Sequence, residues 1–240
     1  QIYCDFSGYS DIAIGAAAIF GFKIPLNFNK PFFATSPTNY WKRWHISLST
    51  WVRDYLYFPL AFKHRKSDVV VYSSLMISMV LMGLWHGASW NFLIWGGIHG
   101  IFLATHTILR RRYPRITLHP FFQKNIGKLF SIVITQYLMF FTFIAFRVKD
   151  FDHMLYSMNK YIFIDFATAK TIEIIRENEF AISLMILFAA LHFISFKQGN
   201  LAEKISKFKL RFWVLFLAAI FLPIALFYVG SAQEFIYFEF

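Results

Sequence analysis

The residue of this sequence most suited to chemistry is a histidine flanked by two glycines. His86 lies between Gly83 and Gly87. Glycine allows a backbone to break or to pass close to another segment, and a neutral imidazole held at such a point could take a proton from a hydroxyl as a general base. The alternative is a histidine that caps a tight turn at a membrane interface, with Trp85 and Trp90 as aromatic anchors.

A second histidine borders an aromatic stripe in residues 36–55. Ser36 and Pro37 are typical of the N-cap and the first residue of a helix. Apolar side chains then recur at steps of three and four residues, which predicts one amphipathic helix at the cytoplasmic interface. The stripe comprises Trp41, Trp44, Leu48, Trp51 and Tyr55, and the opposite face comprises Arg43, Ser47, Thr50 and Asp54. His45 therefore belongs either to a site or to a segment that only anchors the protein to the membrane.

Acidic and hydroxyl side chains form a third cluster near the start of the chain. Asp5, Ser7 and Asp11 lie beside an apolar run, and polar groups at membrane depth are costly enough to be candidates for function. Asp11 shares a helical face with Gly8 and Gly15. Such a face suits either close helix packing or the polar wall of a cavity.

A polar stripe follows His86 in the sequence. Asn91, Trp95 and His99 are spaced at four-residue steps, so they share one helical face. That face is expected to meet protein or water rather than lipid. The sequence has no metal-binding histidine spacing, no phosphate-binding glycine loop and no G-x-S-x-G turn. We therefore expect no metal site and no bound cofactor.

The elements that must position these residues are membrane helices. The 240 residues are 58% apolar and 15% charged, with a mean hydropathy of +0.49, whereas about a quarter of the residues in a soluble domain are charged. Soluble, disordered and disulfide-stabilised classes are thereby excluded, and an all-α polytopic membrane protein is predicted. The predicted spans are Val69–Leu84, Leu129–Phe146, Phe180–Phe196, Phe212–Val229 and the more polar Asn91–Leu109. A shorter run, Ile12–Phe22, is expected to end a helix that begins near Asp5 or before Gln1.

Charge distribution predicts the orientation of these spans. The net charge of +11 could indicate nucleic-acid binding, but no basic stretch matches a known nucleic-acid motif, and cytoplasmic loops of membrane proteins are rich in Lys and Arg. Residues 110–128 hold six basic and no acidic residues, and residues 147–179 hold five basic and six acidic ones. The first loop, with 23–66 and 197–211, is therefore expected in the cytoplasm and the second outside. Within the outer loop, the segment Phe151–Ile164 is expected to lie on the membrane through Phe151, Leu155, Met158 and Ile162.

Five motifs together resemble the membrane-bound O-acyltransferase (MBOAT) family, and most closely its bacterial alginate O-acetyltransferase branch. They are QIYCDFSGYSD (1–11), YWKRWHISLS (40–49), RDY (53–55), GLWHG (83–87) and QEFIYFEF (233–240). The resemblance implies a ring of helices around a transmembrane tunnel, with amphipathic helices at the interfaces. Family members are about twice as long, so residues 1–240 are expected to be the C-terminal portion of one membrane domain, without its N-terminal helices.

The resemblance also implies roles for individual residues. His86 matches the family's essential tunnel histidine, and His45 matches its second characteristic histidine. Residues that could contact substrate or line the tunnel are Asp5, Ser7, Asp11, Trp44, Arg53, Asp54, Trp85, Asn91 and His99. The implied activity is transfer of an acyl group, such as acetyl from acetyl-CoA or another cytoplasmic acyl thioester, across the bacterial inner membrane. The acceptor would be a hydroxyl of an extracytoplasmic partner protein or polysaccharide.

Two other functions are compatible with the same residues. A transporter could use His86, His99 and Asp11 as relay or pathway residues, although the inverted repeats and paired broken helices of transporters are not visible in the sequence. A scaffold subunit of a polysaccharide secretion complex would need the histidines only for structure.

Overall fold

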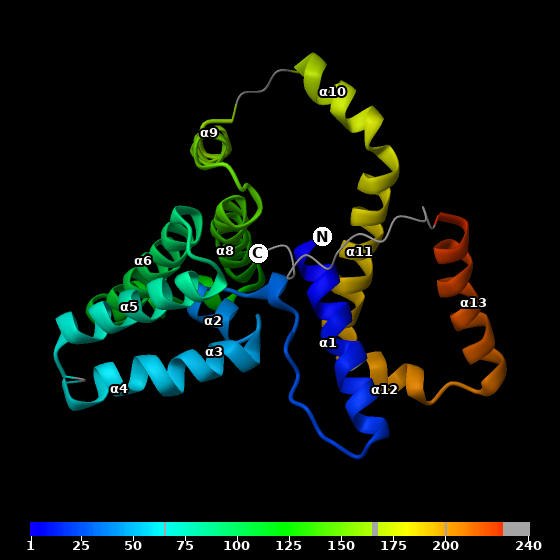
Figure 1. The fold of residues 1–240 in the computed structure, drawn as a ribbon, viewed down its shortest axis with the longest axis horizontal. Coiled ribbons are helices and arrows are strands. Elements are labelled where there is room, and N and C mark those ends of the chain that lie inside the picture. The colour runs from blue at the N-terminus through cyan, green and yellow to red at the C-terminus, as the bar shows by residue number, and fades with distance from the viewer. Residues whose placement is uncertain (65, 165–167, 200, 228–240) are drawn as a thin grey trace. The chain divides into compact units, whose positions relative to one another are not determined.

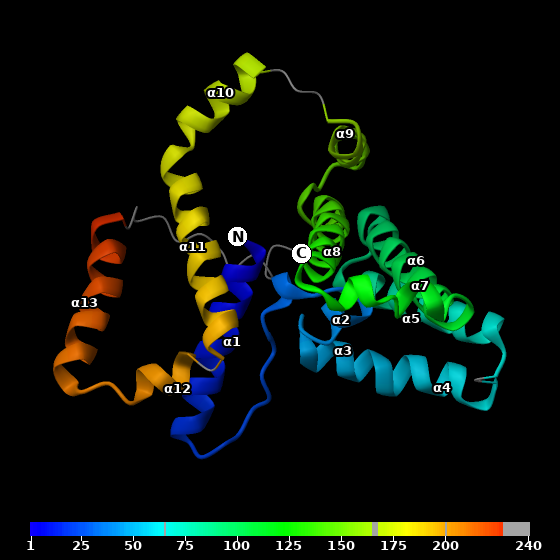
Figure 2. The same cartoon turned by 180° about the vertical axis from the view of Figure 1, so that it is seen from behind.

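The chain is built from helices and loops. The computed structural model describes residues 1–64, 66–164, 168–199 and 201–227, and no strand occurs in these ranges (Figures 1 and 2). The chain divides into two compact units, residues 1–165 and 166–239. The ending motif at 233–240 lies outside the described residues.

The first unit holds the two candidate histidines. Its helices are α1 (Ile2–Ile19), α2 (Pro37–Trp41), α3 (Ile46–Val52), α4 (Phe58–Ala61), α5 (Asp68–His86), α6 (Trp90–Arg112), α7 (Pro114–Thr117), α8 (Asn125–Arg147) and α9 (Phe151–Ile162). Short turns of 3₁₀-helix cover Pro31–Phe33, Phe62–His64 and Pro120–Gln123, and a π-helical turn covers Arg53–Tyr57. The second unit comprises α10 (Thr168–Glu177), α11 (Glu179–Gln198), α12 (Leu201–Ser206) and α13 (Leu210–Phe227).

The predicted spans agree with the helices. Among the described residues, α5, α6, α8 and α11 are long and apolar enough to cross a membrane, which needs about 20 residues. The last predicted span is an apolar but shorter helix over Leu210–Leu226, and the end of that prediction lies outside the described residues. The helix predicted around Ile12–Phe22 begins at Ile2. The chain is thus a multi-pass, all-α membrane protein.

Helices α5 and α6 pack together through glycine. A Cβ on Gly96 would overlap the carbonyl oxygen of Met79 and lie 3.0 Å from the Cα of Val80. A Cβ on Gly83 would overlap the carbonyl oxygen of Phe92. The two backbones can approach this closely only because these positions carry no side chain, as is common between membrane helices.

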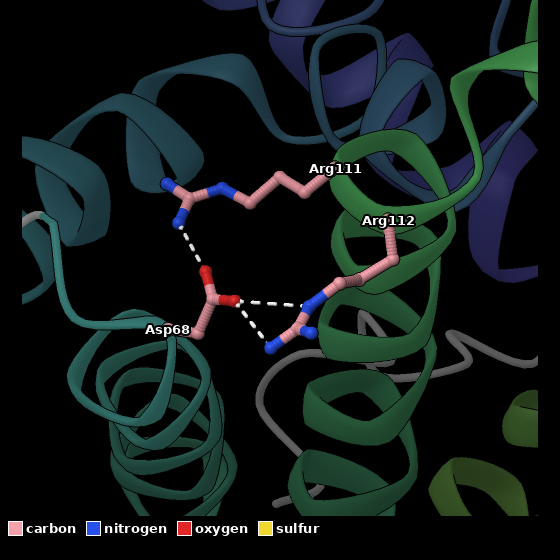
Figure 3. Close-up of polar contacts among 3 residues, drawn as sticks. All are labelled: Asp68, Arg111 and Arg112. Atoms are coloured by element: carbon pink, nitrogen blue, oxygen red, sulfur yellow. Dashed lines mark hydrogen bonds and ion pairs between the residues drawn. The ribbon is translucent and has the colours of Figure 1, made fainter.

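An ion-pair cluster joins the other ends of these two helices. Asp68, at the start of α5, accepts a hydrogen bond of 2.9 Å from Arg111 and one of 3.0 Å from Nη2 of Arg112, both at the end of α6 (Figure 3). The end of α5 at His86 and the start of α6 at Trp90 therefore form the opposite end of one helical hairpin.

The prediction of one amphipathic helix over residues 36–55 is wrong in one respect, because the segment forms two helices with a break between them. Helix α2 ends at Trp41, a turn follows, and α3 starts at Ile46. The break falls on His45, whose φ is +44°. This left-handed conformation is rare for residues with a Cβ and cannot continue an α-helix.

The interfacial helix predicted after α8 is present as α9, and three of the four residues predicted to face the membrane are exposed, whereas the fourth, Met158, is buried. Met154 and Met158 are buried in the core, while Phe151, Leu155 and Ile162 are 39%, 44% and 52% exposed. Helix α9 therefore has apolar groups on two faces. One packs on the protein, and the exposed set remains available to a membrane surface.

The orientation of the spans is testable by labelling. Residues 110–128 are expected on the cytoplasmic side because they carry only basic charges, and residues 147–179 on the outer side. After replacement of Cys4, a cysteine at position 119 should resist a membrane-impermeant thiol reagent in intact cells, and a cysteine at position 153 should react. Labelling of position 119 before the cells are opened would overturn this topology.

Candidate active site

His86 is the last residue of α5, and its imidazole lies among aromatic rings. The helix ends there because Gly87, as C-cap, has an extended backbone that breaks the helical hydrogen-bond pattern. The imidazole packs edge-on against Trp95 at 5.2 Å and against Phe146 at 5.0 Å between ring centroids. Trp85 also lies 4.9 Å away, but it is 64% exposed. His86 is thus partly buried at a helix end, as its flanking glycines predict.

His45 is held in a different way, by a loop residue. Its Nδ1 lies 3.2 Å from Oδ1 of Asn27, and that same oxygen accepts a hydrogen bond of 3.0 Å from the hydroxyl of Ser47. An amide oxygen only accepts, so Nδ1 carries the hydrogen and donates, and Nε2 keeps its lone pair. The ring of Phe6 packs edge-on at 4.6 Å. No pattern in the sequence points to Asn27, which lies 18 residues away.

His86 lies close enough to His45 to affect its charge. Burial, together with a smaller effect of the nearby imidazole of His86, lowers the pKa of His45 to about 4. The ordinary value is about 6.5, so His45 is neutral from mildly acidic to neutral pH. The structure therefore brings together the two histidines predicted from the sequence, although they lie on separate elements.

His99 is buried between tryptophans. Its side chain is 2% exposed, with the Trp95 ring at 4.6 Å and the Trp41 ring at 5.0 Å. Asn91 and Trp95 are also buried, which confirms that this face of α6 meets protein. The ring of Trp95 contacts both His86 and His99 and so lies between the two histidines.

A cavity of about 390 Å³ lies between α5, α6 and the segment from α2 to the π-helical turn. Its lining is mostly apolar and comprises Thr38, Trp41, Lys42, Ile46, Ser49, Thr50, Val52, Arg53, Tyr57, Leu75, Ser78, Met79, Met82, Leu103 and Thr107. Met82 lies one helical turn before His86. Lys42 and Arg53 contribute two cations, and none of the described residues that line the cavity is acidic. Its volume falls in the range of small-molecule sites, about 300–1,000 Å³.

The other predicted site residues on α2–α6 do not gather at one point, and only Arg53 among them lines the cavity. Arg53 lines the cavity and is paired with Asp54 at 2.7 Å. Trp44 is buried and stacks on Tyr40 at 5.5 Å, so it belongs to the core. The amide of Asn91 donates to the carbonyl oxygens of Val148 and Lys149 and thereby ties the start of α6 to the end of α8. In the described structure, Trp44 therefore packs in the core, and Asn91 links α6 to the end of α8 by hydrogen bonds.

The acidic cluster of α1 lies away from the cavity lining. Asp5 and Ser7 are partly buried, and Asp11 is exposed. A Cβ on Gly8 or Gly15 would meet no atom within 4 Å in the part of the chain that the structure describes. The close packing considered for this face is therefore not observed among these residues.

The described residues include no group of three or more histidine, cysteine, aspartate or glutamate side chains that could hold a metal ion. Sequence reasoning missed the cavity residues Trp41, Ser78, Met79 and Met82. Ser78 carried the one usable signal, because it is a hydroxyl within a long apolar run. The methionines look like any other apolar residue of a span.

The fold and the site define an all-α membrane protein with a mostly apolar cavity, and two histidines that follow or precede its lining residues along the chain. A family model, "MBOAT, membrane-bound O-acyltransferase family", matches residues 1–148, and the chain belongs to this family.

Individual relatives agree with this family. The chain is 50% identical over 120 residues to a probable alginate O-acetylase AlgI of Azotobacter vinelandii, a match that covers 50% of the chain and 24% of that protein. It is 37% identical over 201 residues to the probable alginate O-acetylase AlgI of Pseudomonas aeruginosa, a match that covers 82% of the chain and 36% of that protein. A peptidoglycan O-acetyltransferase of Helicobacter pylori is 39% identical over 155 residues, a match that covers 65% of the chain and 28% of that protein. The chain thus spans about a quarter to a third of the length of these relatives.

Proposed function

We propose that this chain is part of a bacterial inner-membrane O-acyltransferase that moves an acyl group, in the first instance acetyl, from a cytoplasmic thioester to a hydroxyl outside the membrane. The observation that supports this most is the cavity that extends to within one turn of His86 and carries cations but no acid in its lining. Such a cavity suits an anionic thioester donor like acetyl-CoA. The family and the O-acetylase relatives supply the reaction class.

The proposed reaction is one acyl transfer. The acceptor hydroxyl oxygen attacks the thioester carbonyl while an imidazole nitrogen of His86 takes the hydroxyl proton. The carbon–sulfur bond then breaks, and the leaving thiolate takes up that proton, so that an ester and a free thiol result. A route in which His86 carries the acyl group briefly has the same balance. The acceptor is a hydroxyl of a polysaccharide or of an acetyl-accepting partner protein outside the membrane.

His45 is proposed to position the donor. It lies beside the cavity-lining residue Ile46 on a segment that also provides Lys42 and Arg53, and its tautomer is fixed by Asn27. This role needs a neutral imidazole, which burial provides.

Replacing His45 by alanine in the full-length protein should raise the KM for the thioester donor roughly tenfold, the scale of one or two lost hydrogen bonds, and lower kcat less. Asn27→Ala should shift KM in the same direction by a smaller factor. Because the pKa of His45 is about 4, the wild-type KM should stay constant from pH 7 to pH 5 and rise only as the pH falls towards 4. Steady-state kinetics with membranes test this. A His45→Ala variant with unchanged donor KM and no turnover would reverse the roles of the two histidines.

The function itself is tested with labelled acetyl-CoA and membranes that contain the full-length protein. Label should appear in an ester on the extracytoplasmic polymer or partner protein, and mild alkali should release it. Membranes that lack the protein are the control. Export of the polymer without any labelled ester would support a transporter or scaffold instead.

A further inference from the structure

The segment that joins α6 to α8 is basic and lies at one face of the membrane. Both helices are long and apolar enough to cross a membrane, so the residues between them start and end on the same face. Residues 110–128 carry six Lys and Arg and no Asp or Glu. Arg111 and Arg112 are paired with Asp68 (Figure 3). The remaining four bases are exposed and form no ion pair with any residue that the structure describes: Arg110, Arg115, Lys124 and Lys128.

Large apolar side chains are exposed between these cations. Ile116 lies in α7, Leu118 follows that helix, and Phe121 lies in the next 3₁₀ turn. All three are exposed. A connecting segment in water would bury such side chains or lack them, whereas a segment that combines exposed cations with exposed apolar groups is typical of a membrane surface.

Packing on α8 holds the backbone of this segment in one path. Gly127 is buried in the first turn of α8, where a Cβ would overlap the carbonyl oxygen of Phe121 and lie 2.8 Å from the Cα of Phe122. The backbone N–H of Phe121 also donates a hydrogen bond of 3.2 Å to Nδ1 of His119. The exposed apolar groups and cations are therefore presented from an ordered backbone.

We propose that residues 110–128 bind anionic phospholipids of the cytoplasmic leaflet. The four unpaired cations contact the phosphates of the headgroups, and Ile116, Leu118 and Phe121 enter between the acyl chains. Lys and Arg form charge-assisted hydrogen bonds with phosphate, and each base near an anionic bilayer strengthens binding roughly fivefold. Because no acidic residue offsets these cations within the segment, anionic headgroups are favoured over zwitterionic ones. The proposal does not depend on the acyl-transfer reaction.

The opposite end of α8 provides the contrast. Arg147 and Lys149 are also exposed bases beside this span, but Asp150 and Asp152 follow them closely in the sequence. The charges of these four side chains cancel, so this end of α8 should not concentrate anionic lipid.

The test is a titration of the full-length protein, in a neutral detergent, with phosphatidylglycerol, followed by native mass spectrometry. Arg115→Gln/Lys124→Gln removes one Arg and one Lys from the basic segment and should weaken binding up to roughly 25-fold, from a fivefold effect of each base. Arg147→Gln/Lys149→Gln makes the same two changes at the other end of α8 and should leave the affinity unchanged. Phosphatidylcholine should bind the wild type and both variants weakly and equally.

A competition experiment distinguishes a lipid from free phosphate as the ligand. At constant ionic strength, excess inorganic phosphate should not displace phosphatidylglycerol, because it has no acyl chains to contact the exposed apolar groups. Displacement would indicate a simple anion site and overturn the lipid assignment. Equal affinity of the wild type and Arg115→Gln/Lys124→Gln, or equal losses in the two double variants, would also overturn the proposal. The replaced side chains are exposed, so both variants should melt at the wild-type temperature in lipid-free detergent.

Discussion

His86→Ala and His86→Gln should each abolish measurable acyl transfer by the full-length protein while leaving its membrane insertion near normal. A general base contributes about 10²–10⁴ in rate, and the loss would be larger if the imidazole also carries the acyl group. Insertion should survive because His86 ends α5, and the apolar content of that span does not depend on it. Transfer of labelled acetyl, normalised to the amount of protein in the membrane, measures the effect.

Two other histidines serve as comparisons in the same assay. His153 lies on α9 with 81% of its side chain exposed, so His153→Ala should transfer at the wild-type rate. His99→Ala should lower thermal stability, because it removes a buried ring from between two tryptophans. Near wild-type transfer by both His86 variants would show that this residue is not catalytic and would favour the transporter or scaffold function.

Gly96→Ala should destabilise the protein although it adds only one methyl group. The new Cβ would overlap the carbonyl oxygen of Met79, which is a backbone atom and cannot rotate away. Overpacking of a close contact costs about 1–3 kcal/mol, so the melting temperature in detergent should fall by several degrees. Transfer should fall too, because α5 carries both His86 and part of the cavity wall.

Gly97→Ala provides the matched control for Gly96→Ala. It makes the same change on the next residue of α6, where a Cβ would meet no atom of the described residues within 4 Å. Alanine favours a helix over glycine by about 0.5–1 kcal/mol, so this variant should melt at or slightly above the wild-type temperature. Equal melting temperatures for the two variants would mean that α5 and α6 do not pack through Gly96.

The sequence predicts the elements that depend on local pattern. The spans follow from runs of apolar residues, and the buried stripe of α6 follows from the four-residue spacing of Asn91, Trp95 and His99. The helix end at His86 could be predicted because its glycines mark it within the sequence itself. Each of these signals lies within one segment.

The parts that could not be predicted depend on contacts between segments. The helix break at His45 accompanies the contacts that Asn27 makes with His45 and Ser47, and these join residues about 20 positions apart. The cavity combines residues from five helical elements, and hydropathy does not distinguish its methionines from lipid-facing ones. On α9, apolar residues occupy two faces, so periodicity alone could not show which face the protein covers.

The backbone of His45 also has a consequence for protein engineering. A positive φ favours glycine, and a side chain there costs about 1–2 kcal/mol. A search that ranks substitutions by folding energy alone would therefore select glycine at position 45, together with glycine at Lys30, whose φ is +50°. The Lys30 change removes a side chain that the proposed chemistry does not use, whereas the His45 change removes the imidazole that is proposed to hold the donor. Thermostabilised versions of this protein should therefore keep residue 45 fixed and draw their gains from other positions.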